Sequence, residues 1–417
     1  MEKFFRYINI ITYYLRKSDL KQLNQLDVLF VCTDHDRGFF YNEKHFAQLI
    51  DTINEDLIQN NIKTGTISRL PSKYKPENKY GNIYSINNLL KYNYILNKYS
   101  KFVYGDISRT SIQPVELGID MWLRVIDRTK PKYIISIEPT IELCIASKLR
   151  NIEIAELQHG VLSSVNYYSE NFRAKYGQMG WPTLLLCWDI DSENWAKKNI
   201  GKYVKTKVIG NPWVNRFIRQ DVNDNLVIDE ITNLPDLKKD KKNILVSLQY
   251  DLTDKYVNEV GIPYQLLDFI KKDGNEYNWL LRIHPVEIKK TGYKNLDQKL
   301  KNIFSNASNI EWDKSSRSAL PALLLNTDLH ITWNSAVTIE ASWFGIRTAL
   351  LSNDTSNIEK YFSAQLENGY ASIIQNKSSA IGSWISQYIS KPKVKNYRSS
   401  YYDSYKVYLN ELIHKLS

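Results

Sequence analysis

The sequence predicts an α/β protein made of two doubly wound domains in series. Apolar runs of strand length alternate with amphipathic runs of helix length along both halves of the chain. A polar stretch rich in Lys and Asp, residues 218–241, separates the two halves. Strict alternation of strands and helices implies parallel sheets with right-handed crossovers, and 417 residues are enough for two such domains.

The first half opens with an unbroken apolar run at 27–33, which is typical of a buried strand. Helical spacing follows at 45–60, and the alternation then continues around a helix-rich middle. Further strands are expected at 62–68, 131–140, 152–160, 181–189 and 206–212, and further helices within 84–130, 141–151 and 192–201.

The second half is more regular, and two of its expected helices end at a glycine, Gly274 and Gly345. Strands are expected at 242–250, 278–285, 310–316, 328–335, 347–353 and 370–376. Helices are expected at 263–274, 296–306, 319–326, 336–345, 358–369 and 379–389.

These elements divide the chain into five ranges. The N-terminal segment lacks both a clean apolar core and a small-residue cleavage site, so an amphipathic helix packed on the first domain is expected there. A helix lying on a membrane surface is the alternative. The ranges are an N-terminal helix at 1–26, a first domain at 27–217, a linker at 218–241, a second domain at 242–390, and a C-terminal helix at 391–417 that packs back on the first domain.

The composition is that of a globular protein, with 43% hydrophobic and 24% charged residues. The formal net charge of +10 favours anionic partners such as phosphates, nucleotides, acidic glycans, the inner membrane leaflet or nucleic acid. The three cysteines lie in apolar runs without a CxxC pair, which fits a reducing cytosol and indicates neither a zinc site nor a disulfide framework. No apolar run approaches the length of a membrane span.

Several common kinds of chemistry are disfavoured. The sequence has no P-loop, no GxGxxG and no GxSxG, which argues against P-loop NTP hydrolysis, hydride transfer and the usual hydrolase chemistry. The pair Asp189 and Asp191 resembles the start of a helix more than a metal site. We therefore expect no bound metal or other cofactor.

Polar residues follow predicted strands in both halves. Gln158, His159 and Gly160 follow one strand, and His284 with Pro285 follows another. Ligands of open parallel sheets bind outside the carboxyl ends of the strands. We therefore expect these residues to border one cleft between the two domains.

In the second half, Asn334, Ser335 and Thr338 open a helix directly after a strand. The free N–H groups and the dipole of such a helix bind anions, and Ser335 is expected to be the N-cap. Glu340, one turn further on, is placed to accept hydrogen bonds from ribose hydroxyls. Plain capping with a solvated Glu340 is the alternative.

The segment 280–290 adds to this donor site. Pro285 fixes a turn, so that His284 can point outward and hydrogen-bond a phosphate. Arg282 lies one strand period away on the same face.

In the first half, Glu138 ends a strand beside the strand that precedes His159. A carboxylate at that place can act as general base toward an acceptor hydroxyl, and Asp34 is its rival. His159 is expected to act in the same cleft, against the alternative of a histidine that only stabilises a turn. The residues expected to bind the acceptor are Asp36, Arg37 and Gln158.

Four short segments, by their order and spacing, resemble the two-Rossmann-domain glycosyltransferases (GT-B) that build bacterial capsule and lipopolysaccharide glycans. RIHP resembles the His-Pro motif of capsule Kdo, polysialic acid and polyol-phosphate transferases. LQHG resembles a strand-end histidine motif of capsule synthesis proteins. The other two segments resemble the donor-binding helix with its Ser/Thr motif and the Gly-Asn-Pro segment that ends the first domain. In the order of the chain, the four are LQHG (157–160), VIGNPWVNRF (208–217), RIHP (282–285) and WNSAVTIEASWFG (333–345).

The resemblance implies a function and roles for individual residues. His284, Ser335 and Thr338 would hold the donor phosphate, and Glu340 the ribose. Because the His-Pro and Ser/Thr pair is common among cytidine-nucleotide enzymes, the expected donor is a CMP-activated acidic sugar such as Kdo or another nonulosonic acid. The acceptor would be a surface glycan, lipid-linked, at the cytoplasmic face of the inner membrane. No acidic-acidic-Gly motif is found, so the resemblance does not identify the base.

Three alternatives remain. A nucleotide-sugar 2-epimerase has the same architecture, and a UDP-sugar or polyol-phosphate transferase shares the motifs. A nucleic-acid-binding module would fit the net charge, but the positive residues are spread out and no recognised nucleic-acid motif is present. We therefore expect no nucleic-acid partner.

Overall fold

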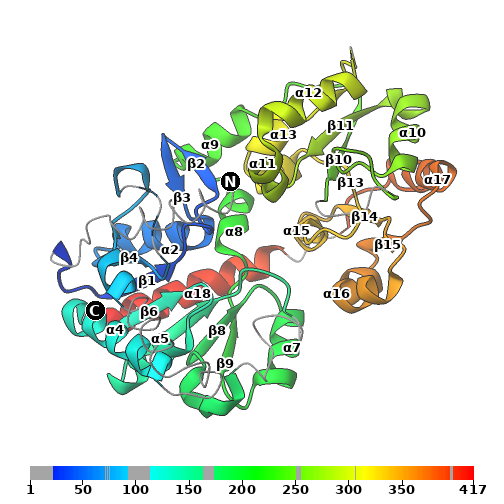
Figure 1. The fold of residues 1–417 in the computed structure, drawn as a ribbon. Coiled ribbons are helices and arrows are strands. Elements are labelled where there is room, and N and C mark those ends of the chain that lie inside the picture. The colour runs from blue at the N-terminus through cyan, green and yellow to red at the C-terminus, as the bar shows by residue number, and fades with distance from the viewer. Residues whose placement is uncertain are drawn as a thin grey trace, which may run out of the picture. The chain divides into compact units, whose positions relative to one another are not determined.

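The computed structural model describes residues 22–70, 72, 74, 76–92, 113–162, 173–249, 255–305, 307–394 and 398–417. It divides into two compact units (Figure 1), Met1–Trp213 with Tyr401–Ser417, and Val214–Ser400. Each unit contains one sheet of parallel strands joined by helices, which confirms the predicted α/β class. The helix expected at 1–26 falls almost entirely outside the described residues.

The sheet of the first unit has seven parallel strands in the order β5-β4-β1-β6-β7-β8-β9. Strand β1 lies between β4 and β6, and all five of its residues are buried. A strand that is covered on both faces needs apolar side chains at every position, which explains the unbroken apolar run. The strands are β1 (Val28–Cys32), β4 (Thr64–Ser68), β5 (Ile83–Tyr84), β6 (Tyr133–Ser136), β7 (Glu153–Leu157), β8 (Leu184–Cys187) and β9 (Lys205–Val208).

Helices cover both faces of this sheet. Alternate residues of β1 point to opposite faces, so Phe30 packs in one core and Leu29 in the other. The helices are α2 (Gln48–Gln59), α4 (Gln113–Thr129), α5 (Ile141–Leu149), α7 (Ile190–Ile200) and α18 (Arg398–Leu416), with short helices η2 (Pro76–Asn78) and η4 (Ala174–Gly180). A hairpin of β2 (Phe39–Tyr41) and β3 (Lys44–Phe46) follows β1.

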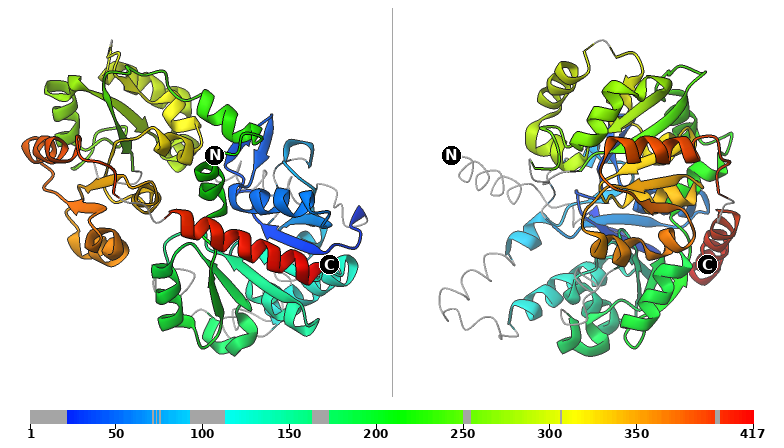
Figure 2. Two further views of the ribbon diagram at one scale, coloured as in Figure 1. Left: turned by 180° about the vertical axis from the view of Figure 1, so that it is seen from behind. Right: turned by 90° about the vertical axis from the view of Figure 1, so that its right-hand side faces the viewer.

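The C-terminal helix α18 packs on the first unit, as Figure 2 shows. Its Tyr408 and Leu412 are buried in the same core as Phe30. Tyr405 donates a hydrogen bond of 2.5 Å from its hydroxyl to Oδ2 of Asp56 on α2. The end of the chain therefore completes one face of the first sheet.

The second unit has six parallel strands in the order β12-β11-β10-β13-β14-β15. They are β10 (Lys242–Ser247), β11 (Tyr277–Arg282), β12 (Ile310–Glu311), β13 (Leu329–Thr332), β14 (Arg347–Leu350) and β15 (Ala371–Ile373). The helices of this unit that follow β10 along the chain are α10 (Tyr264–Lys272), η5 (Gly274–Glu276), α11 (Pro285–Thr291), α12 (Tyr293–Ile303), α13 (Asp313–Arg317), α14 (Leu320–Leu325), α15 (Val337–Trp343), α16 (Thr355–Glu367) and α17 (Ser378–Tyr388).

A buried histidine joins the centre of this second sheet. His330 on β13 lies with Nε2 2.9 Å from Oγ of Ser247 and Nδ1 3.0 Å from Oγ1 of Thr348. Burial lowers the pKa of His330 to about 3, so the ring is neutral. It therefore ties β10, β13 and β14 together.

Two of the differences from the expected elements concern the linker and the expected strand at 310–316. The range 218–241 contains helix α9 (Asn225–Thr232), which follows α8 (Pro212–Arg219) and buries Leu226 and Val227. Ile228 of the same helix is 40% exposed, so only part of the apolar content of α9 is buried, and the polar composition of the range does not indicate a helix. The strand expected at 310–316 ends at Glu311, whose carboxylate accepts hydrogen bonds from the N–H groups of Lys314 and Ser315 and starts α13 instead.

Two further observations concern the whole of the described chain. Within the described ranges, no helix combines the length and the apolar composition that crossing a membrane requires. Nor do three or more His, Cys, Asp or Glu side chains of those ranges gather in a way that could hold a metal ion.

Candidate active site

Three side chains meet where strands of the first sheet end, and we call them the Glu138 cluster. Arg69 follows β4, Glu138 follows β6 and His159 follows β7. His159 Nε2 lies 3.0 Å from Oε1 of Glu138, while Arg69 forms an ion pair with Oε2. The side chains of Arg69, Glu138 and His159 are 17%, 32% and 28% exposed, so the cluster is accessible to a ligand.

The charges of the Glu138 cluster depend on one another. The hydrogen bond from His159 lowers the pKa of Glu138 to about 2, although burial opposes this. Burial also opposes charging of His159, but the hydrogen bond and charge of Glu138 raise the pKa of His159 above its ordinary value. Glu138 is therefore ionised throughout the neutral range, and His159 is the group of this pair that can donate a proton.

Glu138 adopts an unusual backbone conformation, with φ at 46°. Residues other than glycine rarely occupy this left-handed region unless their surroundings hold them there. The two cationic partners hold the Glu138 carboxylate, and Arg173, which is fully buried, donates to the carbonyl of the next residue, Pro139. The turn after β6 is therefore fixed from two sides.

Asp34 and Asp36 follow β1 at the same edge of the sheet. Asp36 accepts hydrogen bonds from N–H and Oγ1 of Thr33, at 2.6 and 2.8 Å. Asp34 is 8% exposed, accepts a hydrogen bond of 3.0 Å from Oγ of Ser72, and lies 3.8 Å from Nζ of the buried Lys79. Both carboxylates are thus held in networks that shape the loops around the edge.

Two residues that were expected to bind the acceptor lie in the interior. Arg37 is 2% exposed, and its Nη1 donates a 2.9 Å hydrogen bond to Oδ2 of the fully buried Asp51. Gln158 is also 2% exposed: its amide donates to the carbonyl of Gly160 and accepts from the N–H of Trp188. Because partners within the first unit use the hydrogen bonds of both buried side chains, these contacts support a structural role and give no support to contact with an acceptor.

In the second unit, His284 follows β11 and caps α11. Its Nδ1 accepts a hydrogen bond of 3.1 Å from the N–H of Val286, so the proton of the neutral ring is on Nε2. Burial and the nearby Arg282 lower the pKa of His284, although Glu287 opposes this. At neutral pH, His284 is therefore an uncharged hydrogen-bond donor at Nε2. Pro285 occupies the first turn of α11, where its missing N–H costs nothing.

Arg282 does not point freely toward a ligand. Its Nη1 donates to the carbonyls of Ser315 and Ser318, at 2.6 and 2.9 Å. Burial lowers the pKa of Arg282 to about 10, against the charges of Glu340 and Glu230. Arg282 therefore fixes the loop after α13 and adds positive charge at the end of β11.

The end of β13 differs from the Glu138 cluster because its polar side chains form few hydrogen bonds with the described residues. Thr338 is fully buried, yet its Oγ1 has no hydrogen-bond partner among the described residues. The Ser335 hydroxyl accepts one hydrogen bond of 3.3 Å, from the N–H of Val337. The N-cap of the seven-residue α15 is Ala336 and not Ser335, contrary to the prediction. Within the described chain, no hydrogen bond is formed to the exposed side chain of Asn334 or to the carboxylate of Glu340.

Glu340 has a strongly perturbed acidity. Burial raises the pKa of Glu340 to about 7, and the nearby Arg282 only partly offsets this. A carboxylate with this pKa and no hydrogen bonds within the described chain would gain much from donors that a ligand brings. This is the combination expected of a binding residue.

The structure adds two residues that the sequence analysis missed. Arg69 follows a strand directly, so the same strand-end rule that selected His159 would have found it. Glu230 lies on α9, within the range expected to be a linker, and its Oε2 accepts a 2.5 Å hydrogen bond from the N–H of Ala319. No local pattern points to Glu230, because its partner is far away in the sequence.

No protein-family model matches the chain, and no curated protein matches its sequence. Solved structures do match. A UDP-GlcNAc 2-epimerase from Neisseria meningitidis bound to UDP-GlcNAc has 14% identity and a TM-score of 0.57, with 93% of this chain and 99% of that chain covered. A UDP-GlcNAc 2-epimerase from Methanocaldococcus jannaschii has 16% identity and a TM-score of 0.56, with 91% and 98% covered.

The H444N variant of the wall teichoic acid polymerase TagF has 15% identity and a TM-score of 0.54, with 98% of this chain and 92% of that chain covered. Identities this low show a shared fold. The chain therefore has the GT-B fold, with two Rossmann-like α/β units.

Proposed function

We propose that the chain is a glycosyltransferase that transfers a sugar from a nucleotide donor to a bacterial surface glycan. The observation that carries this proposal is the end of β13, where, within the described residues, the buried Thr338 Oγ1 has no hydrogen-bond partner and the Glu340 carboxylate receives no hydrogen bond. Buried polar groups are normally paired, so such a group at a strand end favours a polar ligand.

The nucleotide fits this edge of the second sheet by its chemistry. The Nε2–H of His284 and the hydroxyl of Ser335 would donate to a phosphate oxygen. The Glu340 carboxylate would accept hydrogen bonds from the ribose hydroxyls. Arg282, held by two carbonyls, would stabilise the charge of the leaving phosphate without moving.

A CMP-activated acidic sugar such as Kdo or another nonulosonic acid is the donor we favour. A CMP donor carries one phosphate, and a UDP donor carries two. Of the residues named for the donor site, only Arg282 is cationic, since His284 has a lowered pKa. This modest positive charge suits a single phosphate, in line with the resemblance of the RIHP segment.

In the first unit, we assign the chemistry at the acceptor hydroxyl to the Glu138 cluster. Glu138 is ionised at neutral pH, as a general base must be, although a pKa of about 2 makes it a weak one. Asp34 is the second candidate for the base, and Asp36 borders the same edge. The acceptor would be lipid-linked, and the net charge of +10 would favour an anionic inner-membrane surface in the cytoplasm.

A nucleotide-sugar 2-epimerase is the second candidate. Similar structures include UDP-GlcNAc 2-epimerases, and the Glu138–His159 pair offers a carboxylate and a proton donor together. A UDP-sugar or polyol-phosphate transferase is a third possibility, which the likeness to a teichoic acid polymerase supports.

One experiment separates these functions. The protein is incubated with CMP-Kdo, CMP-sialic acid or UDP-GlcNAc, with and without a lipid-linked glycan extract, and followed by NMR. Our proposal predicts that CMP is released from a CMP-sugar only when the glycan extract is present. UDP-GlcNAc incubated with the protein alone should stay unchanged. Conversion of UDP-GlcNAc alone to its 2-epimer would overturn the transferase, and transfer from UDP-GlcNAc would overturn the CMP donor.

A further inference from the structure

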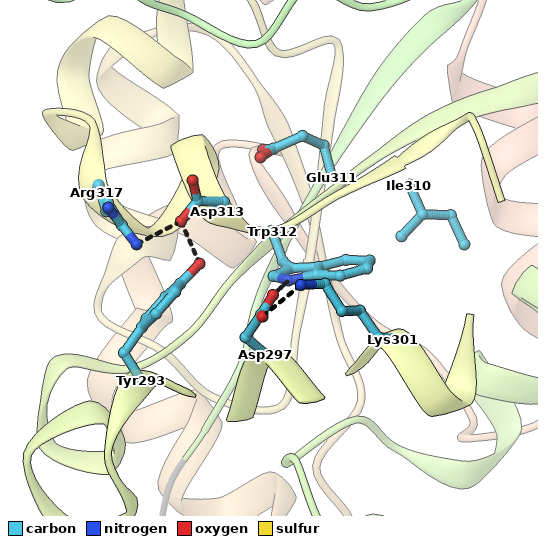
Figure 3. A pocket seen from close by; sticks show the side chains of 8 residues that line it. All are labelled: Tyr293, Asp297, Lys301, Ile310, Glu311, Trp312, Asp313 and Arg317. Carbon is cyan, nitrogen blue, oxygen red and sulfur yellow. Dashed lines mark hydrogen bonds and ion pairs between the residues drawn. The ribbon is translucent and has the colours of Figure 1, made fainter. Parts of the chain in front are cut away.

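A pocket of about 400 Å³ lies at the edge of the second sheet (Figure 3), and none of its lining residues is assigned to the donor. Its walls come from α12, from the edge strand β12 and from α13. Three wall residues, Tyr293, Asp297 and Lys301, repeat every four positions along α12 and therefore share one helical face. The other lining residues are Ile310, Glu311, Trp312, Asp313 and Arg317.

Trp312 is the central residue of this pocket and is held in place. Its indole Nε1–H donates a 3.1 Å hydrogen bond to Oδ1 of Asp297, and Lys301 lies 2.7 Å from the other oxygen of the same carboxylate. The ring is partly buried and packs on the core of the unit. An indole fixed in this way offers a rigid flat surface at low entropic cost.

The opposite wall is equally well ordered. The Tyr293 hydroxyl donates to Asp313, which also forms a 2.8 Å ion pair with Arg317. The Arg317 guanidinium lies 4.4 Å from the centre of the Tyr293 ring. Figure 3 shows these groups together with Trp312, Asp297 and Lys301 around the same hollow.

A second hollow of about 500 Å³ shares Trp312 and Lys301 with the first. Its remaining walls are Phe304, Ser305, Ala307 and Ser308. Two adjacent open hollows with a common aromatic residue suit a ligand made of repeating units better than a single compact molecule. Each volume is within the range of small-molecule sites.

The chemistry of the walls narrows the class of ligand. The flat apolar ring of Trp312, next to carboxylates, a hydroxyl and the Lys301 amine, matches a sugar ring, which has an apolar face and a rim of hydroxyl groups. The pocket has three carboxylates against two cations, so the lining carries one net negative charge. This charge favours a neutral sugar over an acidic one.

The geometry points to a carbohydrate subsite for neutral hexopyranose units of a glycan chain, centred on Trp312. Its lining residues differ from those assigned to the donor, and it would hold part of the acceptor chain. For the identity of its ligand this inference rests on the proposed function, because an elongating glycosyltransferase is the enzyme that meets such chains.

The subsite is tested on the full chain labelled with 5-fluorotryptophan, with the Trp312 resonance assigned by Trp312→Phe. Maltotetraose, cellotetraose, fully N-acetylated chitotetraose and a tetrasaccharide of sialic acid are titrated at millimolar concentrations. At least one neutral tetrasaccharide should shift the Trp312 signal. Trp312→Ala should weaken its binding about tenfold, because the stacked ring is lost.

Three controls make the result specific. Tyr264→Ala removes an exposed aromatic side chain on α10 of the same unit, outside both hollows, and should leave binding unchanged. Lys301→Met changes an exposed side chain that lines both hollows, so it should weaken binding even if Trp312→Ala does not fold. CMP binding to Trp312→Ala, measured in parallel, should equal that of the wild type.

Two results would overturn the subsite. One is the absence of any Trp312 shift with the neutral sugars, or a shift with the sialic acid tetrasaccharide alone. The other is neutral-sugar binding that survives both Trp312→Ala and Lys301→Met. Failure of CMP to bind, with sugar binding intact, would count against the donor assignment and not against this subsite.

Discussion

His159 Nε2 lies 3.0 Å from Oε1 of Glu138, and this contact joins the ends of two neighbouring strands in the first unit. The pair carries opposite charges, because each partner stabilises the charged form of the other. Arg69 adds a second cation to the same carboxylate. The cluster thus stores a proton on His159 next to a carboxylate that stays ionised.

Replacing Glu138 with Gln should destabilise the fold by about 2 kcal/mol at pH 5.5, since a hydrogen bond between charged groups is lost. The pKa of Glu138 is about 2 against an ordinary 4.5, so its stabilising effect is complete above pH 4.5 and is lost as the pH falls toward 2. The pKa of His159 is raised above 6.5, so its effect is complete below pH 6.5 and is lost at higher pH.

Urea unfolding of the wild type and Glu138→Gln at pH 5.5 and pH 9 measures this. The stability difference should be larger at pH 5.5 than at pH 9, where His159 has lost its charge. An equal or larger difference at pH 9 would show that the pair is not ionic.

His284→Asn and His284→Ala should separate the two roles of this residue. Asn is a good N-cap, so His284→Asn should keep the stability of α11, while His284→Ala should lose about 1 kcal/mol. Neither side chain replaces the Nε2–H donor, so both variants should lose most of the turnover. Thermal unfolding and rate assays on the two variants provide the test, and wild-type turnover in His284→Asn would refute the assignment.

Thr338→Val should stabilise the free protein by up to about 1 kcal/mol, because a buried hydroxyl without a partner in the described chain is removed. The same change should weaken nucleotide binding, because the hydroxyl would be lost as a partner for the ligand. Denaturant unfolding and calorimetric titration with CMP measure both effects. Loss of stability together with unchanged CMP binding would place the Thr338 hydroxyl outside the donor site.

Glu340→Gln should change both stability and its pH dependence. The pKa of Glu340 is about 7 against an ordinary 4.5, so the wild type loses stability as the pH rises from 4.5 to 7. Glu340→Gln lacks this loss and should therefore be more stable than the wild type at pH 8. We expect a difference on the order of 1 kcal/mol, because solvent screens the charge of a partly exposed carboxylate. CMP affinity should fall more steeply in the wild type than in Glu340→Gln as the pH drops from 8 to 6, because protonation of the CMP phosphate affects both proteins and protonation of Glu340 only the wild type. Equal pH profiles would contradict a carboxylate–ribose contact.

Arg37→Met should cost about 3 to 5 kcal/mol of stability, because it leaves the carboxylate of Asp51 buried without its cation. The double variant Arg37→Met, Asp51→Leu should recover much of that loss. Arg69→Met, at a more exposed ion pair, should cost clearly less. Chemical denaturation ranks the three, and a mild effect of Arg37→Met would restore the possibility that Arg37 contacts the acceptor.

The sequence predicts those features that depend on local patterns. Strand-end positions correctly placed Glu138 next to His159, because parallel strands put their carboxyl ends at one edge. The burial of a side chain cannot be predicted from its position at a strand end. Arg37 and Gln158 also follow strands, yet each is enclosed by partners distant in sequence, such as Asp51 and Trp188.

The two roles of His284 show the same limit. The HP dipeptide indicates a turn, but only the structure shows that Nδ1 caps α11 and thereby fixes the proton on Nε2. The structure likewise shows that Glu230, in a range of polar composition, holds the loop near Arg282 through Ala319. Such contacts depend on tertiary packing, and no local pattern carries them.

The central claim is that a nucleotide binds where β11 and β13 end in the second unit. A crystal of the protein soaked with CMP tests it most directly. We predict the phosphate within hydrogen-bond distance of His284 Nε2 and the Ser335 hydroxyl, and the ribose hydroxyls at the Glu340 carboxylate. CMP bound at the Glu138 cluster, or a crystal in which CMP leaves His284, Ser335 and Glu340 untouched, would contradict it.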